Sequence, residues 1–198
     1  GYYRRAVALH RTAAVVTRRF NGRVPQDTAD LRSLPGVGPA TTGAVQAFGF
    51  GLPAVFVETN IRRAALHEFY PNRKQISDRE LLPLLEKALD RSDPRRWYWA
   101  LMDYGAFLAR TIPNPNRRSA HYSQQRSFEG SNRQQRGLIL RVLANRGAVP
   151  VNQLWILIGA SEIVDQDRAK HNLEAMVAEG FLDTEGGIVT LASGREDA

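Results

Sequence analysis

The stretch from Leu34 to Arg63, LPGVGPATTGAVQAFGFGLPAVFVETNIRR, constrains the chain more than any other part of the sequence. Its opening, Pro35–Gly38, has two glycines two residues apart, and neither carries a Cβ that would prevent a sharp turn or a close backbone approach. Pro39 or Ala40 can then begin a helix whose first N–H groups lack partners within the helix. Such a turn attracts anions, and a phosphate group is the obvious candidate.

The residues that follow the turn make the pattern specific. A Gly-Phe-Gly sequence, a proline and the apolar run Ala54–Val57 lead to Glu58, Thr59 and Asn60. This order resembles the helix-hairpin-helix and following loop of the DNA glycosylase superfamily that includes endonuclease III and MutY. The resemblance implies an all-α core in which Asp27–Leu34 is the first helix of the motif and Pro39–Phe48 the second.

Two further segments carry the same resemblance. The opening Gly-Tyr-Tyr, with Leu9-His10, is similar to the MutY branch, and Met102-Asp103 with Gly105-Ala106 matches the family's closing helix. In that family the Gly-Tyr-Tyr segment lies well inside the domain. The resemblance, which covers roughly residues 1–105, therefore implies that the domain's first helices precede this chain.

Charge is distributed unevenly along the 198 residues, which are enough for one or two domains. Residues 1–126 contain 20 Lys and Arg against 10 Asp and Glu, whereas residues 127–198 contain 7 against 10. The basic excess lies in the same part as the hairpin, as expected of a protein that binds the phosphate backbone of double-stranded DNA. An Arg-rich solvated surface would give the same numbers.

Several classes of protein are disfavoured. The sequence has no uninterrupted apolar stretch of about 18 residues, so no membrane span is predicted. The N-terminus lacks a secretory h-region, and without cysteine there is no disulfide framework or thiolate metal site. We expect a monomer in the cytoplasm, associated with the nucleoid through DNA.

Glu58 is the candidate catalytic carboxylate. An enzyme that acts on a base must take it out of the duplex, and cleavage of the sugar–base bond builds positive charge on the sugar. A fixed carboxylate can stabilise that charge or activate water. The family usually has Asp at this position, and Glu58 is one methylene longer. The alternative role for Glu58 is a helix-cap or salt-bridge acid.

The resemblance also implies the DNA contacts. The N–H groups of the hairpin would hold a DNA phosphate, and its carbonyl groups, Leu34–Gly38, could hold a monovalent cation. Arginines near Glu58 or in the later loop would lie near the DNA backbone, or would be exposed helix charges and loop-packing residues. The predicted DNA-binding residues are Pro35, Gly36, Val37, Gly38, Ala40, Thr41, Asn60, Arg62, Arg63, Arg117 and Arg118.

Ala40 occupies the position at which members resembling endonuclease III have a lysine nucleophile. A methyl group cannot form a Schiff base, so base removal without strand cleavage is predicted. Resemblance to the MutY branch favours release of adenine from a mismatch with guanine or 8-oxoguanine. The alternatives are a glycosylase for thymine, uracil or another modified base, and a DNA-binding protein of the same fold without catalysis.

The segment Thr111–Asn132 contains two prolines and little periodicity. In the family an iron–sulfur loop with four cysteines begins here. The corresponding positions hold Ala109, Asn116, Ser119 and Gln125, so this cluster is not predicted, and apart from the possible monovalent cation at the hairpin no cofactor or metal is predicted.

Residues 127–198 are predicted to form a separate domain. Three helical segments precede two short apolar runs around Gly186-Gly187, which indicates a β-hairpin. This order resembles a winged helix, a relative of the helix-turn-helix fold used on DNA. Because its net charge is negative, binding of a protein partner is as reasonable an expectation as binding of DNA.

Overall fold

The computed structural model describes residues 3–124, 127–159 and 166–192. The chain divides into two compact units, Tyr2–Ser123 and Gln124–Ala198. The predicted boundary after residue 126 falls beside residues 125–126, which lie outside the described part. The predicted architecture, an all-α core followed by a winged-helix-like domain with a small β-hairpin, is confirmed. Within the described ranges, no helix combines the length and the apolar character needed to cross a membrane.

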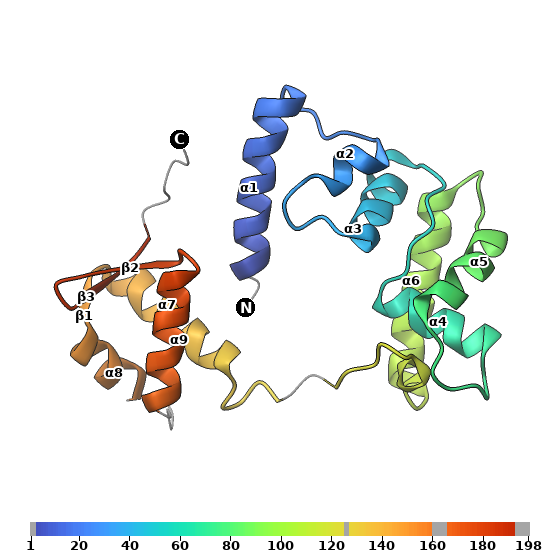
Figure 1. Cartoon of the computed structure of the whole chain (residues 1–198). Helices are drawn as coiled ribbons and strands as arrows, with labels where there is room; N and C mark the ends of the chain where they lie inside the picture. The colour runs from blue at the N-terminus through green and yellow to red at the C-terminus, as the bar shows by residue number, and fades with distance from the viewer. Residues whose placement is uncertain (1–2, 125–126, 160–165, 193–198) are drawn as a thin grey trace. The chain divides into compact units, whose positions relative to one another are not determined.

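The first unit is helical throughout (Figure 1). Its elements are α1 (Tyr3–Phe20), α2 (Thr28–Arg32), α3 (Pro39–Ala44), the π-helical turn η1 (Val45–Gly49), α4 (Thr59–Phe69), α5 (Asp78–Ala88), α6 (Pro94–Thr111) and the 3-10 turn η2 (Pro115–Arg118). Strong local signals set several of these boundaries. The Asp27 carboxylate accepts hydrogen bonds from two N–H groups of α2, and Ser77 with Glu80 forms a capping box at the start of α5.

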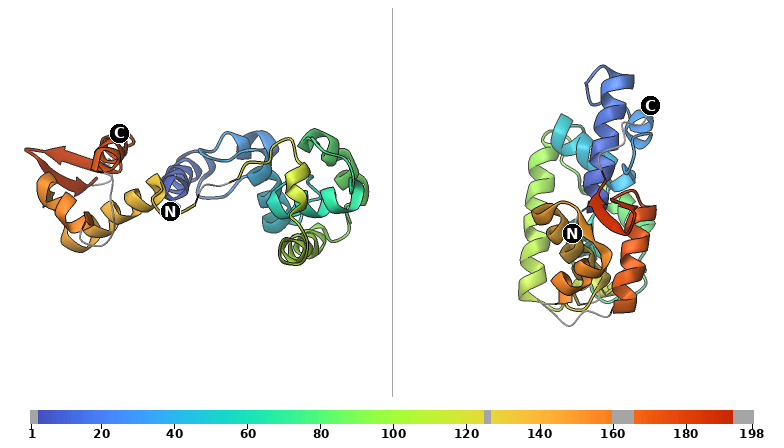
Figure 2. Two further views of the ribbon diagram at one scale, coloured as in Figure 1. Left: turned by 90° about the horizontal axis from the view of Figure 1, so that it is seen from below. Right: turned by 90° about the vertical axis from the view of Figure 1, so that its left-hand side faces the viewer.

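Two apolar clusters hold this unit together. A small one joins α1 to the hairpin through Val16, Leu31 and Leu34. A larger one joins η1, α4, α5 and α6 around Tyr98, whose side chain is fully buried. Figures 1 and 2 show α4, α5 and α6 as neighbouring helices. Burial of this apolar surface is the main stabilising contribution to the unit.

The hairpin packs closely against α1. Gly36 has a φ of +74°, in the left-handed region, and a Cβ at this position would lie 2.7 Å from the Cβ of Ala8. The Thr12 hydroxyl donates a hydrogen bond of 2.8 Å to the carbonyl oxygen of Pro35. Only glycine meets both the conformational and the steric requirement at position 36.

The second hairpin helix differs slightly from the prediction. In place of one α-helix over Pro39–Phe48, α3 ends at Ala44 and continues as the π-helical turn η1. An extended connection then leads from Gly51 to α4. A Cβ on Gly43 would lie 2.5 Å from the Cβ of Phe56, so α3 and this connection are in direct contact.

The second unit contains α7 (Asn132–Arg146), β1 (Val149–Pro150), α8 (Val151–Gly159), α9 (Gln166–Ala178), β2 (Leu182–Glu185) and β3 (Ile188–Leu191). The strands form an antiparallel sheet of order β1-β3-β2, in which Val149 pairs with Val189. Apolar residues of the three helices and the sheet form one core, with Leu143, Leu154 and Met176 among its buried members. The two-residue strand β1 had no signal of its own in the sequence.

Candidate functional site

Glu58 occupies the position immediately before α4. Its Oε1 atom accepts hydrogen bonds from the N–H groups of Asn60, at 2.6 Å, and Ile61, at 2.8 Å. The side chain is half-buried, and no described residue forms a hydrogen bond with its second oxygen, Oε2. The predicted capping role is therefore present. One oxygen is fixed by the helix and the other remains for a further partner.

The buried Arg63 guanidinium holds the first turn of α4 in place. The Arg63 guanidinium donates from Nη1 to the Asn60 side-chain oxygen at 2.6 Å and to the Gly105 carbonyl at 2.8 Å. Arg63 is only 8% exposed. Asn60 does lie beside Glu58, as predicted. Arg63, however, is enclosed by protein, so we do not retain it as a DNA contact and assign it the role of supporting this turn.

Arg62 joins α4 to α5. Its Nε and Nη2 atoms donate to the two carboxylate oxygens of Asp78, each at 2.6 Å. These hydrogen bonds raise the pKa of Arg62 against a lowering by burial, and the charges of Asp78 and Glu58 raise it further. Because this fork-like pair already uses the guanidinium, Arg62 is a weaker candidate for a phosphate contact than the sequence predicts.

The hairpin presents part of its surface to solvent. Gly36, Ala40 and Thr41 are exposed, and Pro35, Val37 and Gly38 are half-buried. The N–H group of Val37 already donates to the Leu34 carbonyl at 3.1 Å. This turn is thus stabilised from within. Phosphate binding by the hairpin remains a prediction. Because the Val37 N–H group already has a partner, the exposed residues of the hairpin are the better candidates for this contact.

Three of the hairpin carbonyl groups already serve as hydrogen-bond acceptors. Those of Leu34, Pro35 and Gly38 already accept hydrogen bonds from Val37, Thr12 and Thr42, respectively. Each of these oxygens has a second lone pair, so the monovalent cation at the hairpin remains a prediction.

The loop after α6 does not fit an iron–sulfur cluster. Ala109 is an exposed helix residue, and Gln125 lies outside the described part. Asn116 and Ser119 are buried: the Asn116 amide donates to the Thr59 carbonyl, and the Ser119 hydroxyl accepts from the N–H group of His121. A methyl group, an amide and a hydroxyl are not ligands that hold such a cluster.

The two arginines of this loop occupy different environments. Arg117 is exposed, and the described residues form no hydrogen bond with its side chain. Arg118 is half-buried, and its Nη2 atom donates to the Leu66 carbonyl at 2.9 Å. Arg117 therefore remains a candidate for a phosphate contact, whereas Arg118 fastens the loop to α4.

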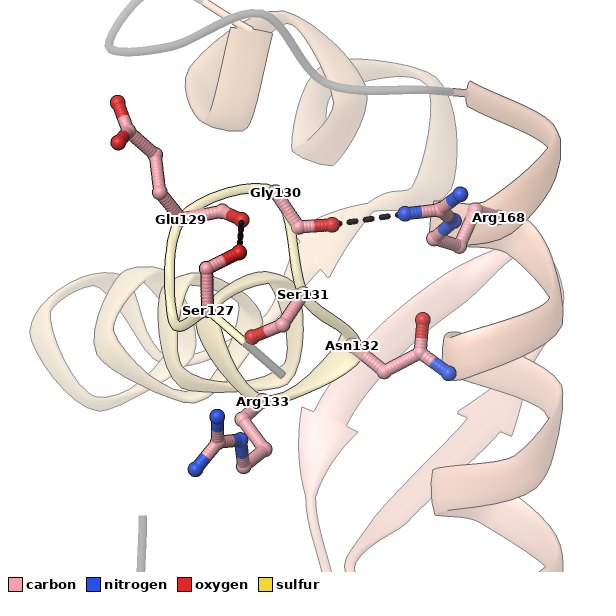
Figure 3. A pocket seen from close by; sticks show the side chains of 7 residues that line it. All are labelled: Ser127, Glu129, Gly130, Ser131, Asn132, Arg133 and Arg168. Atoms are coloured by element: carbon pink, nitrogen blue, oxygen red, sulfur yellow. Dashed lines mark hydrogen bonds between the residues drawn. The ribbon is translucent and has the colours of Figure 1, made fainter. Parts of the chain in front are cut away.

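A separate hollow lies in the second unit (Figure 3). It is lined by Ser127, Glu129, Gly130, Ser131, Asn132, Arg133 and Arg168. The Arg168 guanidinium donates to the Gly130 carbonyl at 2.7 Å, which ties α9 to the turn before α7. None of the predicted site residues lines this hollow, and we assign it no part in base release.

No protein-family model matches the chain, but comparison with known proteins identifies relatives of similar sequence. An adenine DNA glycosylase of Buchnera aphidicola subsp. Baizongia pistaciae is 33% identical over 112 residues, which are 54% of this chain and 31% of the relative. An adenine DNA glycosylase of Mycobacterium tuberculosis is 30% identical over 203 residues, covering 92% of this chain and 65% of the relative. Endonuclease III of Escherichia coli is 32% identical over 97 residues, covering 48% and 46%.

The chain belongs to the helix-hairpin-helix DNA glycosylase superfamily. Within the superfamily it lies on the MutY-like branch. It spans about a third of the Buchnera relative and 65% of the mycobacterial one. The match to the mycobacterial protein covers 92% of the present chain. The similarity therefore extends beyond residues 1–105, the range over which the sequence motifs predicted it.

Sequence reasoning missed two residues that support the site. Tyr98 was not singled out among the aromatic residues of α6, yet its hydroxyl accepts from the Phe56 N–H group at 3.3 Å and donates to the Ala54 carbonyl at 2.9 Å. Asn114 accepts from Arg63 at 3.2 Å. The sequence signal for Asn114 was its place before a proline, where an Asn side chain commonly caps a turn.

Proposed function

We propose that the protein is a monofunctional DNA glycosylase of base excision repair, which hydrolyses the N-glycosidic bond of a flipped base in double-stranded DNA. The preferred substrate is adenine mispaired with guanine or 8-oxoguanine, in keeping with relatives named adenine DNA glycosylase. The observation that carries the proposal is the half-buried Glu58 carboxylate, fixed through Oε1 by two backbone N–H groups, with Oε2 free of hydrogen bonds to the described residues.

This geometry suits the chemistry of the reaction. As the sugar–base bond lengthens, the sugar carbon gains positive charge. A carboxylate whose position is already fixed stabilises that charge without reorganising, and the same oxygen can accept a proton from an attacking water molecule. The base leaves with the bonding electrons and takes up a proton, while the water oxygen becomes bonded to the sugar carbon.

The remaining predicted roles fit around Glu58. The exposed flank of the hairpin, with Gly36, Ala40 and Thr41, would contact the strand that carries the flipped nucleotide, and Arg117 would add a phosphate contact. Ala40 has no amine, so no covalent Schiff base forms and the DNA strand remains intact after the base is released.

The proposal is tested with the complete chain and a panel of labelled duplexes, each containing one mismatch or one modified base. Adenine opposite 8-oxoguanine, adenine opposite guanine, thymine opposite guanine and uracil opposite guanine are the minimum set. Released base is detected as strand cleavage after hot alkali, and lyase activity as cleavage without it. We expect adenine release in the first two duplexes and cleavage only after alkali.

Glu58→Gln removes the charge and retains an oxygen that can accept the two N–H hydrogen bonds. We expect it to lower the single-turnover rate constant by about a hundredfold or more. The matched control is Glu86→Gln, an exposed glutamate of α5, which leaves the rate unchanged. Full activity of Glu58→Gln would exclude this mechanism. Release of thymine or uracil alone would change the substrate, and release of no base at all would favour a DNA-binding protein without catalysis.

A further inference from the structure

The loop after α6 folds back along α4 and contacts it through three alternating residues. Asn114 Oδ1 accepts from Arg63 Nε at 3.2 Å, Asn116 Nδ2 donates to the Thr59 carbonyl at 3.0 Å, and Arg118 Nη2 donates to the Leu66 carbonyl at 2.9 Å. We call Asn114, Asn116 and Arg118 the loop brace. Its contacts extend from the first turn of α4 to its last, so the loop fixes the helix along its length.

The loop brace is itself held in place by backbone hydrogen bonds. The N–H group of Ile76 donates to the Arg118 carbonyl at 3.0 Å, and that of Ala120 donates to the Ile76 carbonyl at 2.9 Å. Ile76 is fully buried, and Asn116 is 6% exposed. The loop is therefore a packed part of the first unit, despite its irregular sequence.

Two contacts of the loop brace converge on the turn that carries Glu58. The first is direct, because Asn116 bonds to the carbonyl of Thr59, the residue next to Glu58. The second passes from Asn114 to Arg63 and from there to the Asn60 side chain. The N–H group of Asn60 in turn donates to Glu58 Oε1. Rotation of this turn would break both contacts and would move the carboxylate.

We propose that the loop brace is a positioning element for Glu58, in which Asn116 and Asn114 hold the first turn of α4 in the orientation needed for base release. This inference rests on the proposed function. Asn116 also occupies one of the positions that would hold a cluster ligand in the resembling proteins. At this position a hydrogen-bonded amide, which supplies no thiolate for such a cluster, connects the loop to α4.

The two asparagines use their amides in opposite ways, which provides a sharp test. Thr59 presents a carbonyl oxygen, so Asn116 must donate to it, and Asn116→Asp replaces that donor with a second acceptor. Asn114 acts only as an acceptor, receiving hydrogen bonds from Arg63 and from the N–H group of Asn116. Asn114→Asp retains both hydrogen bonds. The same chemical change, two residues apart, should therefore have opposite effects.

The first readout is hydrogen exchange at the N–H groups of Asn60 and Ile61, both of which donate to Glu58. We expect Asn116→Asp to accelerate their exchange about tenfold, since loss of one buried hydrogen bond is of that magnitude. Asn114→Asp should leave exchange within about twofold of wild type. Ala120→Ser, an exposed change in the same loop, is the matched control. This measurement needs no substrate, so it tests the positioning even if the proposed function fails.

The second readout separates chemistry from binding. Asn116→Asp should lower the single-turnover rate of base release about tenfold, while affinity for a duplex containing a stable abasic-site analogue changes less than about twofold. Asn114→Asp should retain the wild-type rate. Wild-type exchange at Asn60 and Ile61 in Asn116→Asp would overturn the inference, as would equal impairment of both variants. If the wild-type protein releases no base, the proposed function is contradicted, but the positioning role tested by hydrogen exchange is not.

Discussion

At the scale of single residues, Tyr98 supports the segment that leads to Glu58. Its hydroxyl satisfies the Phe56 N–H group and the Ala54 carbonyl, and its ring centroid lies 4.3 Å from that of Phe56. Tyr98→Phe keeps the ring and removes the hydroxyl partner of the buried Phe56 N–H group and of the half-buried Ala54 carbonyl. We expect a loss of about 1–3 kcal/mol in the free energy of unfolding of the first unit at neutral pH.

The same variant should change the response to alkali. Burial raises the pKa of Tyr98, against a smaller lowering by the Phe56 N–H group. A tyrosine in an unfolded chain ionises at about pH 10. Between that pH and the higher pKa of the folded state, deprotonation stabilises the unfolded chain more than the folded one. Wild-type stability should therefore fall over this window, and more steeply than that of Tyr98→Phe. Urea unfolding from pH 7 to pH 11 measures the difference; parallel curves would contradict it. Exposed Tyr122→Phe is the control.

Residue-level prediction succeeded where the sequence fixes local geometry and failed where packing decides. Glu58 was placed correctly at the start of a helix because a polar residue between an apolar run and a helical pattern favours a cap. Phe69 is an apolar residue of α4, yet it is 41% exposed at the end of that helix. Arg63 was read as a surface charge because nothing in the sequence shows that Gly105 brings α6 close to it.

At the scale of elements, Gly105 determines how closely α4 and α6 can approach. A Cβ at this position would lie 2.2 Å from the Asn60 carbonyl oxygen, a backbone atom that cannot move alone. We expect Gly105→Ala to lower the free energy of unfolding by about 3 kcal/mol and to slow base release, because it displaces the turn that carries Glu58. Circular dichroism during urea unfolding, together with single-turnover kinetics, measures both effects.

Gly137 provides the matched control for Gly105. It also lies inside a long helix, α7, but a Cβ there would meet no atom within 4 Å beyond its chain neighbours and the adjacent helix backbone. Gly137→Ala should therefore stabilise the second unit by about 0.5–1 kcal/mol, the gain expected when Ala replaces Gly within a helix. If both variants were equally destabilised, close packing at Gly105 would not be the cause.

Elements formed by interactions between residues close in sequence could be predicted, whereas those that depend on residues distant in sequence could not. The helices carry periodic apolar residues and local caps, so their positions were anticipated to within a few residues. The π-helical turn η1 and the strand β1 were missed, because the first depends on packing around Ala47 and the second on pairing with β3, distant in sequence. The loop brace depends on contacts across more than 50 positions, such as Asn114 with Arg63, that no local pattern encodes.

At the scale of the whole molecule, the uneven charge makes a testable distinction between the two units. Residues 1–126 carry 20 basic against 10 acidic side chains, and residues 127–198 carry 7 against 10. If DNA binds the first unit through phosphate contacts, each such contact releases condensed counterions. The logarithm of the affinity then falls linearly with the logarithm of the salt concentration, with a slope proportional to the number of contacts. Charge removal should then matter in the first unit and not in the second.

Arg117→Ala and Arg141→Ala test this distinction, since each removes one exposed arginine and changes the net charge equally. Affinity for an undamaged duplex is measured by fluorescence anisotropy at several salt concentrations. Arg117→Ala should weaken binding and reduce the slope of log affinity against log salt by about 1, as expected for one lost phosphate contact. Arg141→Ala, in α7, should leave the slope unchanged. A reduced slope for Arg141→Ala instead would place the DNA contact in the winged-helix-like unit, and an equal reduction for both would mean that net charge, rather than a specific surface, governs binding.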